Sequence, residues 1–158
     1  MQQQRHTIGM VRPKIEKYCS YQERCQQEVV LKLKSYLMSE DDINQVLYEL
    51  VKKNFINEER FAQAYARGKS RQKKWGKTKI VFELKKRKIS EYCIKKALQE
   101  IDEDDYESAT ITLAEKYFGK LKDHLMVTKK RKTITYLIGK GYDYELSKKI
   151  VETITIKP

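Results

Sequence analysis

The sequence lacks any long apolar run. No stretch approaches the roughly 20 apolar residues that a membrane-spanning helix needs. The first ten residues, M-Q-Q-Q-R-H-T-I-G-M, contain no apolar segment of the kind found in secretory signals. These two absences predict a cytoplasmic protein with no membrane partner.

Residues that bind metals or form disulfides are scarce. The three cysteines, Cys19, Cys25 and Cys93, are odd in number and lack the spacing of metal-ligand motifs. They fall within helical patterns, so we expect reduced, buried thiols. The two histidines, His6 and His124, have no cysteine or carboxylate cluster around them in the sequence. The composition therefore predicts no metal site.

Motifs of catalysis are also missing. The chain contains neither a phosphate-binding G-x-x-x-x-G-K-[ST] loop nor a dinucleotide-binding G-x-G-x-x-G. The acidic run Asp102 to Asp105 is a conceivable cation site, but such carboxylates more often occupy the first turn of a solvent-exposed helix. We therefore predict a protein that is not an enzyme, with no cofactor and no small-molecule substrate.

Signals for β-strands are weak throughout. No hairpin dipeptide separates alternating runs, and the one alternating stretch, residues 153–156, is better explained as the end of a helix. Apolar residues recur instead at intervals of three and four, which is typical of amphipathic helices. This periodicity predicts an all-α fold.

Helix starts are predicted from capping residues. Pro13 fits the first turn of a short helix that reaches about Cys19. The run 20–23, Ser-Tyr-Gln-Glu, has the pattern of a capping box that opens a second helix. Further starts are predicted at short polar residues whose side chains can accept from first-turn amides, namely Ser39, Asn57, Ser90 and Asp143.

An internal repeat organises these helices. Residues 33–47 recur 51 positions later as residues 84–98, with a leucine, a capping serine and an isoleucine at the same spacing. Residues 137–151 follow the second copy by 53 positions. Because short helices with one apolar face cannot bury it alone, each copy should pack three helices together. We predict a mobile N-terminal arm and then three tandem three-helix, helix-turn-helix-like repeats, at residues 1–12, 13–56, 57–101 and 102–158.

Positive charge is concentrated in the second repeat. The chain carries 34 basic and 22 acidic residues, a net charge of +12. Residues 57–101 contain 14 basic and 5 acidic residues, against 9 and 7 before them and 11 and 10 after them. A localised excess of this kind suits a polyanion or an acidic protein surface.

The excess follows a helical stripe. On a 3.6-residue period, Arg60, Arg67, Arg71 and Lys74 lie opposite Phe61 and the rest of the apolar face. Lysine and arginine on such a face can neutralise phosphates without reading bases, although many charged faces serve only solubility. Trp75 is a candidate for stacking on bases, whereas Tyr65 fits the core better. The predicted DNA- or protein-binding residues are Arg60, Arg67, Arg71, Lys73, Lys74, Lys77, Lys79, Lys86 and Arg87.

The same stretch carries a family resemblance. Its pattern E-R-F-A-x-x-Y-x-R, then W-G, then K-I-x-x-E-L-x-x-R-x-I, resembles the central motif of the RecX family of bacterial modulators of the RecA recombinase. The segment 18–25 is similar to the opening of Bacteroidetes-type members. Many members have glycine where this chain has Lys88, and proline and arginine where it has Lys77 and Lys79.

The resemblance implies both a shape and a role. It implies an elongated, curved array of three-helix repeats that binds the RecA filament, with single- and double-stranded DNA as further partners. It also implies inhibition of RecA ATPase and recombinase activity, in homologous recombination, DNA repair and the SOS response. The alternative is a sequence-nonspecific DNA- or RNA-binding helical protein that acts without RecA. A monomer is expected because no helix carries a sustained heptad.

Overall fold

The computed structural model describes residues 4–156, and this part of the chain contains nine α-helices and no strand. The predicted all-α fold is therefore confirmed for these residues, and residues 153–156 form the end of the last helix. The helices are α1 (Ile8–Tyr21), α2 (Gln26–Lys34), α3 (Glu40–Lys52), α4 (Glu58–Arg71), α5 (Lys77–Lys86), α6 (Glu91–Gln99), α7 (Glu103–Lys120), α8 (Met126–Gly139) and α9 (Tyr144–Ile156).

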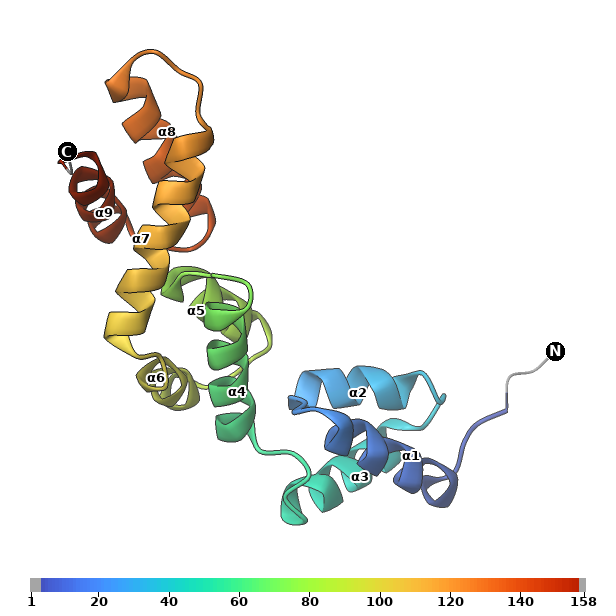
Figure 1. The fold of residues 1–158 in the computed structure, drawn as a ribbon. Coiled ribbons are helices and arrows are strands. Elements are labelled where there is room, and N and C mark those ends of the chain that lie inside the picture. The colour runs from blue at the N-terminus through green and yellow to red at the C-terminus, as the bar shows by residue number, and fades with distance from the viewer. Residues whose placement is uncertain (1–3, 157–158) are drawn as a thin grey trace.

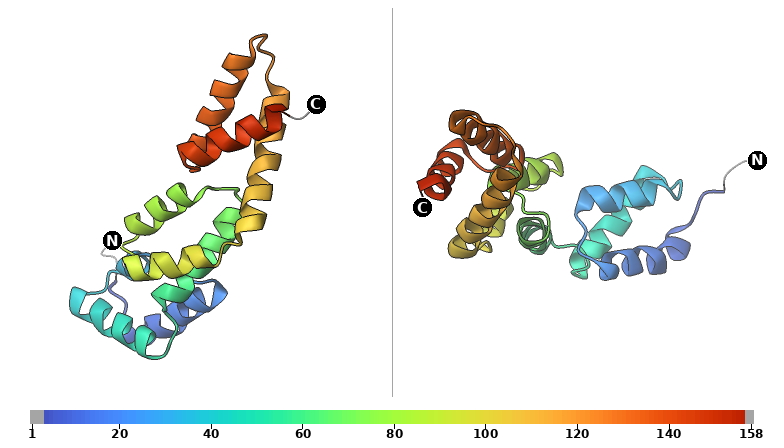
Figure 2. Two further views of the ribbon diagram at one scale, coloured as in Figure 1. Left: turned by 90° about the vertical axis from the view of Figure 1, so that its left-hand side faces the viewer. Right: turned by 45° about the horizontal axis from the view of Figure 1, so that its top comes forward.

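The helices form three groups of three. Within each group every helix packs on the other two. We call α1–α3 module 1, α4–α6 module 2 and α7–α9 module 3. The modules follow one another along a bent, elongated molecule (Figure 1), and the further views in Figure 2 show the same succession.

Two hydrophobic cores support the three modules. Module 1 has a core of its own, which includes Val11, Ile15 and Leu33. Modules 2 and 3 share one continuous core, in which residues such as Ile80 of α5 and Leu137 of α8 are fully buried. Modules 2 and 3 thus form one packing unit, to which module 1 is attached.

The repeat seen in the sequence is also a repeat of backbone conformation. In each module the turn after the second helix contains one residue with positive φ: Leu37 at 57°, Lys88 at 60° and Gly141 at 101°. These positions are separated by the same 51 and 53 residues as the sequence repeat. Left-handed backbone favours glycine, so Leu37 and Lys88 adopt it at a cost that Gly141 avoids.

The predicted caps are present at four helices. The backbone N–H of Arg60 donates to Asn57 Oδ1 at 2.9 Å, and that of Leu146 donates to Asp143 Oδ1 at 2.7 Å. Ser39 and Ser90 accept in the same way from the third residue after them. Local chemistry alone therefore fixed these four starts.

The first helix begins earlier than predicted. α1 starts at Ile8, where Thr7 accepts from the backbone of Met10, rather than at Pro13. Val11 is fully buried in the core of module 1, so residues 8–12 belong to the helix and not to an arm. Val11 and Ile15 lie four positions apart and are both buried, so the apolar stripe of α1 begins before Pro13. Residues 1–3 of the predicted arm lie outside the described residues.

The predicted capping box at residues 20–23 is wrong. Ser20 lies inside α1, where its hydroxyl donates to the carbonyl of Glu16 at 2.8 Å. α2 starts after Cys25 instead, whose backbone N–H donates to the Glu28 carboxylate at 3.3 Å. α1 runs to Tyr21 because Cys19 continues its buried stripe.

Candidate nucleic-acid interface

Helix α4 presents the predicted basic stripe. It buries Phe61, Ala62 and Ala66 against the shared core, which leaves Arg67 and Arg71 on the opposite side. The helix ends at Arg71, and the chain turns through Lys74, whose φ is 57°. The side chains of Arg71, Lys73 and Lys74 are exposed and form no ion pair within residues 4–156.

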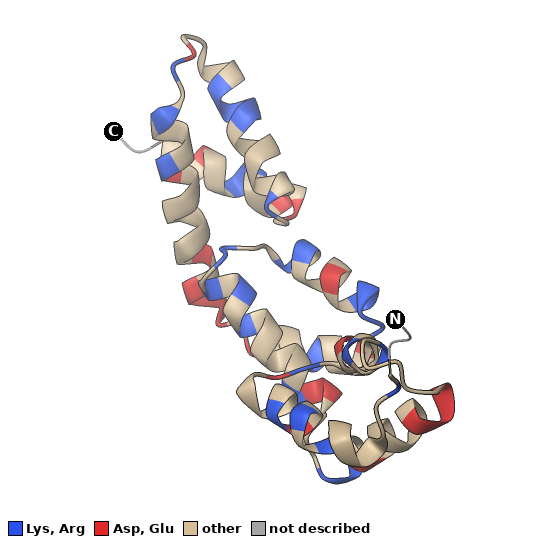
Figure 3. Ribbon diagram, turned by 90° about the vertical axis from the view of Figure 1, so that its right-hand side faces the viewer, with Lys and Arg blue, Asp and Glu red and all other residues tan. Residues whose placement is uncertain are grey.

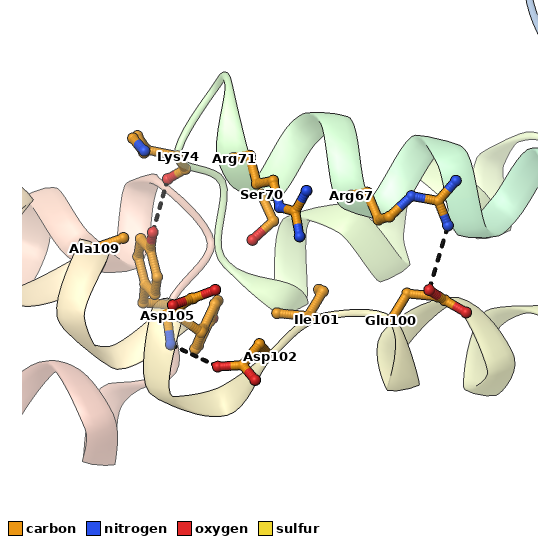
Figure 4. A pocket seen from close by; sticks show the side chains of 11 residues that line it. Arg67, Ser70, Arg71, Lys74, Glu100, Ile101, Asp102, Asp105 and Ala109 are labelled. Atoms are coloured by element: carbon orange, nitrogen blue, oxygen red, sulfur yellow. Dashed lines mark hydrogen bonds and ion pairs between the residues drawn. The ribbon is translucent and has the colours of Figure 1, made fainter.

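This stripe faces acidic residues that the local sequence does not reveal. Arg67, Arg71 and Lys74 line a cavity of about 250 Å³ together with Asp102 and Asp105, from the start of α7 (Figure 4). Arg67 Nη1 lies 3.4 Å from a carboxylate oxygen of Glu100. Figure 3 shows the acidic start of α7 beside the basic end of α4. The tertiary structure therefore places carboxylates of the α7 N-terminus across a cavity from part of the basic stripe.

Two of the predicted residues lie instead between modules 1 and 2. Arg60 pairs with Glu23 at 2.5 Å and donates to the carbonyl of Asn54 at 3.0 Å. Arg87 bonds Glu83 at 3.0 Å and lies 3.8 Å from Glu28 of module 1. Bonding to Arg87 lowers the pKa of Glu83 below its ordinary value. Arg60 and Arg87 therefore have structural partners already.

Lys77 lies at the junction of modules 2 and 3. Its backbone N–H donates to the hydroxyl of Tyr106 at 2.9 Å. Its ammonium group pairs with Glu103 and lies 4.8 Å from the centre of the Tyr106 ring. These contacts explain the partial burial of Lys77 without any ligand.

Trp75 is covered by lysines. The ammonium groups of Lys69 and Lys79 lie 4.9 Å and 4.4 Å from its ring centre, and Tyr65 packs edge-on against it at 6.4 Å. Both aromatic rings rest on the shared core. Burial raises the pKa of Tyr65, and its hydroxyl has no partner in the structure. Tyr65 therefore packs as expected, and Trp75 shares that role.

The loop that carries Lys73 and Lys74 is fixed by module 3. The Lys73 carbonyl accepts from Lys140 Nζ at 3.1 Å, and the Lys74 carbonyl accepts from the Tyr142 hydroxyl at 2.9 Å. With its carbonyls held, the loop directs both lysine side chains to solvent. Lys86, at the end of α5, is also largely exposed.

Modules 2 and 3 both match family models of known proteins. Residues 57–98 match the model for the second three-helix domain of RecX, and residues 103–151 match the model for the third. Together these two matches cover more than half of the 158-residue chain.

The chain belongs to the RecX family.

Individual RecX proteins align over most of the chain. The regulatory protein RecX of Clostridium perfringens (strain 13 / Type A) is 30% identical over 134 residues, which cover 84% of this chain and 62% of that protein. The RecX of Streptococcus uberis is 28% identical over 141 residues, or 89% of this chain and 54% of that protein. The chain thus spans between about half and two thirds of the length of these relatives.

A solved RecX structure has the same fold. The crystal structure of RecX from Lactobacillus salivarius superposes with a TM-score of 0.83 at 26% identity, covering 95% of this chain and 97% of that one. The relatives that align with this chain are named regulatory proteins.

The cysteines and the acidic residues also bear on the predictions from the sequence. Cys19 and Cys25 are buried free thiols, and burial raises the pKa of Cys19 to about 11. Within residues 4–156 no three histidine, cysteine, aspartate or glutamate side chains are placed to hold a metal. No helix in this range is long and apolar enough to cross a membrane.

The set of predicted contacts omits two exposed residues of module 2. Phe82 and Lys85 lie on the outer face of α5, and both are exposed. The signal was available, because Ile80 and Leu84 define the inward face of α5 and Phe82 lies between them.

Proposed function

We propose that this protein binds RecA–DNA filaments and inhibits the RecA ATPase and recombinase activity. Its membership of the RecX family supports the regulatory part of this proposal. The observation that carries the DNA part is the charge of module 2, with 14 basic and 4 acidic residues within residues 57–98, the region that matches the family's second domain.

Two kinds of surface on module 2 support contact with a protein–DNA filament. Arg71, Lys73 and Lys74 have exposed side chains without ion pairs, as phosphate contacts require. The adjoining cavity is lined by basic residues on one side and by Asp102 and Asp105 on the other. Such a lining suits a protein surface that carries both charges better than it suits a phosphate. One edge of module 2 would thus meet DNA and RecA together.

The elongated shape suggests how inhibition arises. An array of three modules can lie along the filament and contact neighbouring RecA protomers (Figure 1). Bridging protomers would hinder the motions that accompany ATP turnover and filament growth. Both single- and double-stranded DNA remain proposed partners, since phosphate contacts do not distinguish them.

Several finer features belong to the same proposal. We infer a monomeric, cytoplasmic protein whose repeats have boundaries at residues 56/57 and 101/102. We also retain the Bacteroidetes-type subgroup as a proposal based on residues 18–25. Of the predicted contacts, we place Arg71, Lys73, Lys74, Lys79 and Lys86 on the binding surface, and Arg67 at its edge.

The proposal is tested by single-stranded-DNA-dependent ATP hydrolysis of the cognate RecA. Titration of this protein should inhibit hydrolysis at well below one molecule per RecA, because one molecule acts on an assembly. The variant Arg71→Glu/Lys73→Glu/Lys74→Glu should lose most of this inhibition.

A matched variant controls for total charge. Lys17, Lys34 and Lys52 are exposed residues of module 1, and their replacement by glutamate changes the net charge equally. That variant should keep inhibiting RecA. Equal inhibition by both variants would reject the module 2 surface. DNA binding without any effect on RecA would favour a nucleic-acid-binding protein that acts alone.

A further inference from the structure

The outer face of α5 presents an exposed phenylalanine. Ile80 and Leu84 are fully buried in the shared core, and Phe82 lies between them on the opposite side of the helix. Its side chain is 62% exposed. Single exposed apolar residues are common on protein surfaces, so the role of this one depends on what surrounds its ring.

Three of the four helix positions next to Phe82 are lysines. Residues three and four positions away are its neighbours on the helix surface, and these are Thr78, Lys79, Lys85 and Lys86. None of the four is acidic. Glu83, the nearest acid in sequence, is engaged by Arg87 at 3.0 Å and has its carboxylate largely covered. The outer face of α5 therefore combines one uncovered ring with Lys85, which forms no ion pair within residues 4–156, and Lys86, whose ammonium group lies 3.9 Å from Glu83. The ammonium group of Lys79 lies over the Trp75 ring instead.

The other aromatic residues of module 2 are differently placed. Phe61 is buried and packs against Tyr65. Cations lie over the rings of Tyr65 and Trp75, and Lys96 lies 5.7 Å from the ring centre of the exposed Tyr92. Within residues 4–156, no cation lies over the ring of Phe82. Its faces are open to a planar ligand.

We propose that Phe82 stacks on an unpaired base of single-stranded DNA while Lys85 and Lys86 contact the flanking phosphates. Each nucleotide offers a flat base and a negative charge, which matches a ring beside lysines. In a duplex the base faces are already stacked on one another, so this site selects single strands. The choice of DNA over RNA rests on the proposed function. Within that function, α5 is the element that contacts single-stranded DNA.

Direct binding to a fluorescent oligo-dT, followed by anisotropy without RecA, tests the site. Phe82→Ala should weaken binding by roughly 10-fold, in the range seen when stacking residues are removed. The dependence of affinity on salt should not change, because no charge is lost. Lys85→Ala should instead reduce the slope of log affinity against log salt by about 0.7.

Two further variants separate stacking from general disruption. Phe82→Trp should restore binding, since tryptophan presents a larger flat ring. Tyr48→Ala is the matched control: Tyr48 of module 1 is 68% exposed, with Lys52 5.9 Å from its ring centre. It should bind oligo-dT like the unaltered protein. The midpoint of thermal unfolding, measured for each variant, shows whether its fold is intact.

Four outcomes would overturn the site. The first is that Phe82→Ala binds oligo-dT as tightly as the unaltered protein does. The second is that the substitution weakens binding to duplex DNA as much as binding to oligo-dT, and the third is that it weakens binding to oligo-rU more than to oligo-dT. The fourth is that the variant loses RecA inhibition but keeps its affinity for oligo-dT, which would make the α5 face a protein contact. Because the binding assay contains no RecA, a failure of the regulatory proposal leaves this result interpretable by itself.

Discussion

The two junctions between modules are held by different kinds of interaction. Modules 2 and 3 are joined through the backbone: the Gly76 N–H donates to the Lys140 carbonyl at 2.8 Å, and the Thr78 N–H donates to the Gly141 carbonyl at 3.0 Å. Modules 1 and 2 are joined mainly through side chains, including the pair of Arg60 with Glu23. Modules 2 and 3 share many residues of one continuous core, to which module 1 contributes Cys25, whereas the other buried residues of module 1 form a separate core.

This difference has a mechanical consequence. Backbone hydrogen bonds fix both position and direction, and the close approach at Gly76 leaves no room for an alternative packing. Long charged side chains can exchange partners with water and salt at little net cost. We therefore expect modules 2 and 3 to move as one body, and module 1 to reorient against them.

The largest effect is expected at Gly76. A Cβ atom there would lie 2.2 Å from the carbonyl carbon of Gly141, which is backbone and cannot rotate away. Gly76→Ala should therefore lower the free energy of unfolding by about 3 kcal/mol, measured by urea denaturation.

A second glycine provides the control. Gly68 lies inside α4, and nothing lies within 4 Å of a Cβ added there. Gly68→Ala should stabilise the protein by up to about 1 kcal/mol, because alanine has the higher helix propensity. If both substitutions had similar effects, close packing would not define the junction of modules 2 and 3.

A smaller and more local effect is expected at Arg60. Arg60→Met keeps the apolar stem but removes the ion pair with Glu23 and the bond to Asn54. It should cost about 1 kcal/mol, since both charged groups are partly exposed. The radius of gyration in small-angle scattering should increase as module 1 detaches, as it should for the unaltered protein at high salt.

The comparison for Arg60 lies within module 1. Arg12 makes an ion pair with Glu49 at 2.9 Å, with similar exposure of both side chains. Arg12→Met also removes an ion pair between arginine and glutamate, but this pair lies within module 1 and not between modules. The radius of gyration should therefore stay constant. An equal increase in both variants would contradict a hinge at this place.

The smallest effect is a change in pH dependence at Glu58. Burial raises the pKa of Glu58 above its ordinary value; the bond from the Gln26 N–H opposes this rise, and the charge of Glu28 adds to it. The folded state therefore favours protonated Glu58. The stability that this preference contributes is fully present below about pH 4.3, and it is lost as the pH rises through the raised pKa of the folded state.

The substitution Glu58→Gln tests this cost. The amide oxygen can still accept from the Gln26 N–H, but it carries no charge. The variant should be more stable than the unaltered protein at pH 7, and the gain should disappear at pH 4. Thermal unfolding followed across this range measures it, and a gain that is constant with pH would contradict a titrating Glu58.

Particular elements show where the sequence was sufficient. Asn57, Ser39, Ser90 and Asp143 begin their helices as predicted, because a cap depends on residues three positions apart. The start of α1 and the opening of α2 were misplaced, because burial of Val11 and Cys19 extended a helix past local signals. Local chemistry competes with packing, and packing prevailed at both places.

The candidate site shows the same division. Helical periodicity placed Arg67 and Arg71 on one face correctly, since that face depends only on the helix itself. It could not show that Asp102 and Asp105 lie opposite them, or that Arg60 and Arg87 contact module 1. The predicted set of nine contacts is consequently divided among a cavity, two junctions and an outer surface.

The sequence by itself determined that the chain is helical, that it repeats three times, and that the second repeat carries the positive charge. These properties follow from spacing and composition along the chain. The tertiary structure decided which cations stay free, which rings remain uncovered, and which modules move together. Each of these depends on residues that are distant in sequence and meet only when the helices pack.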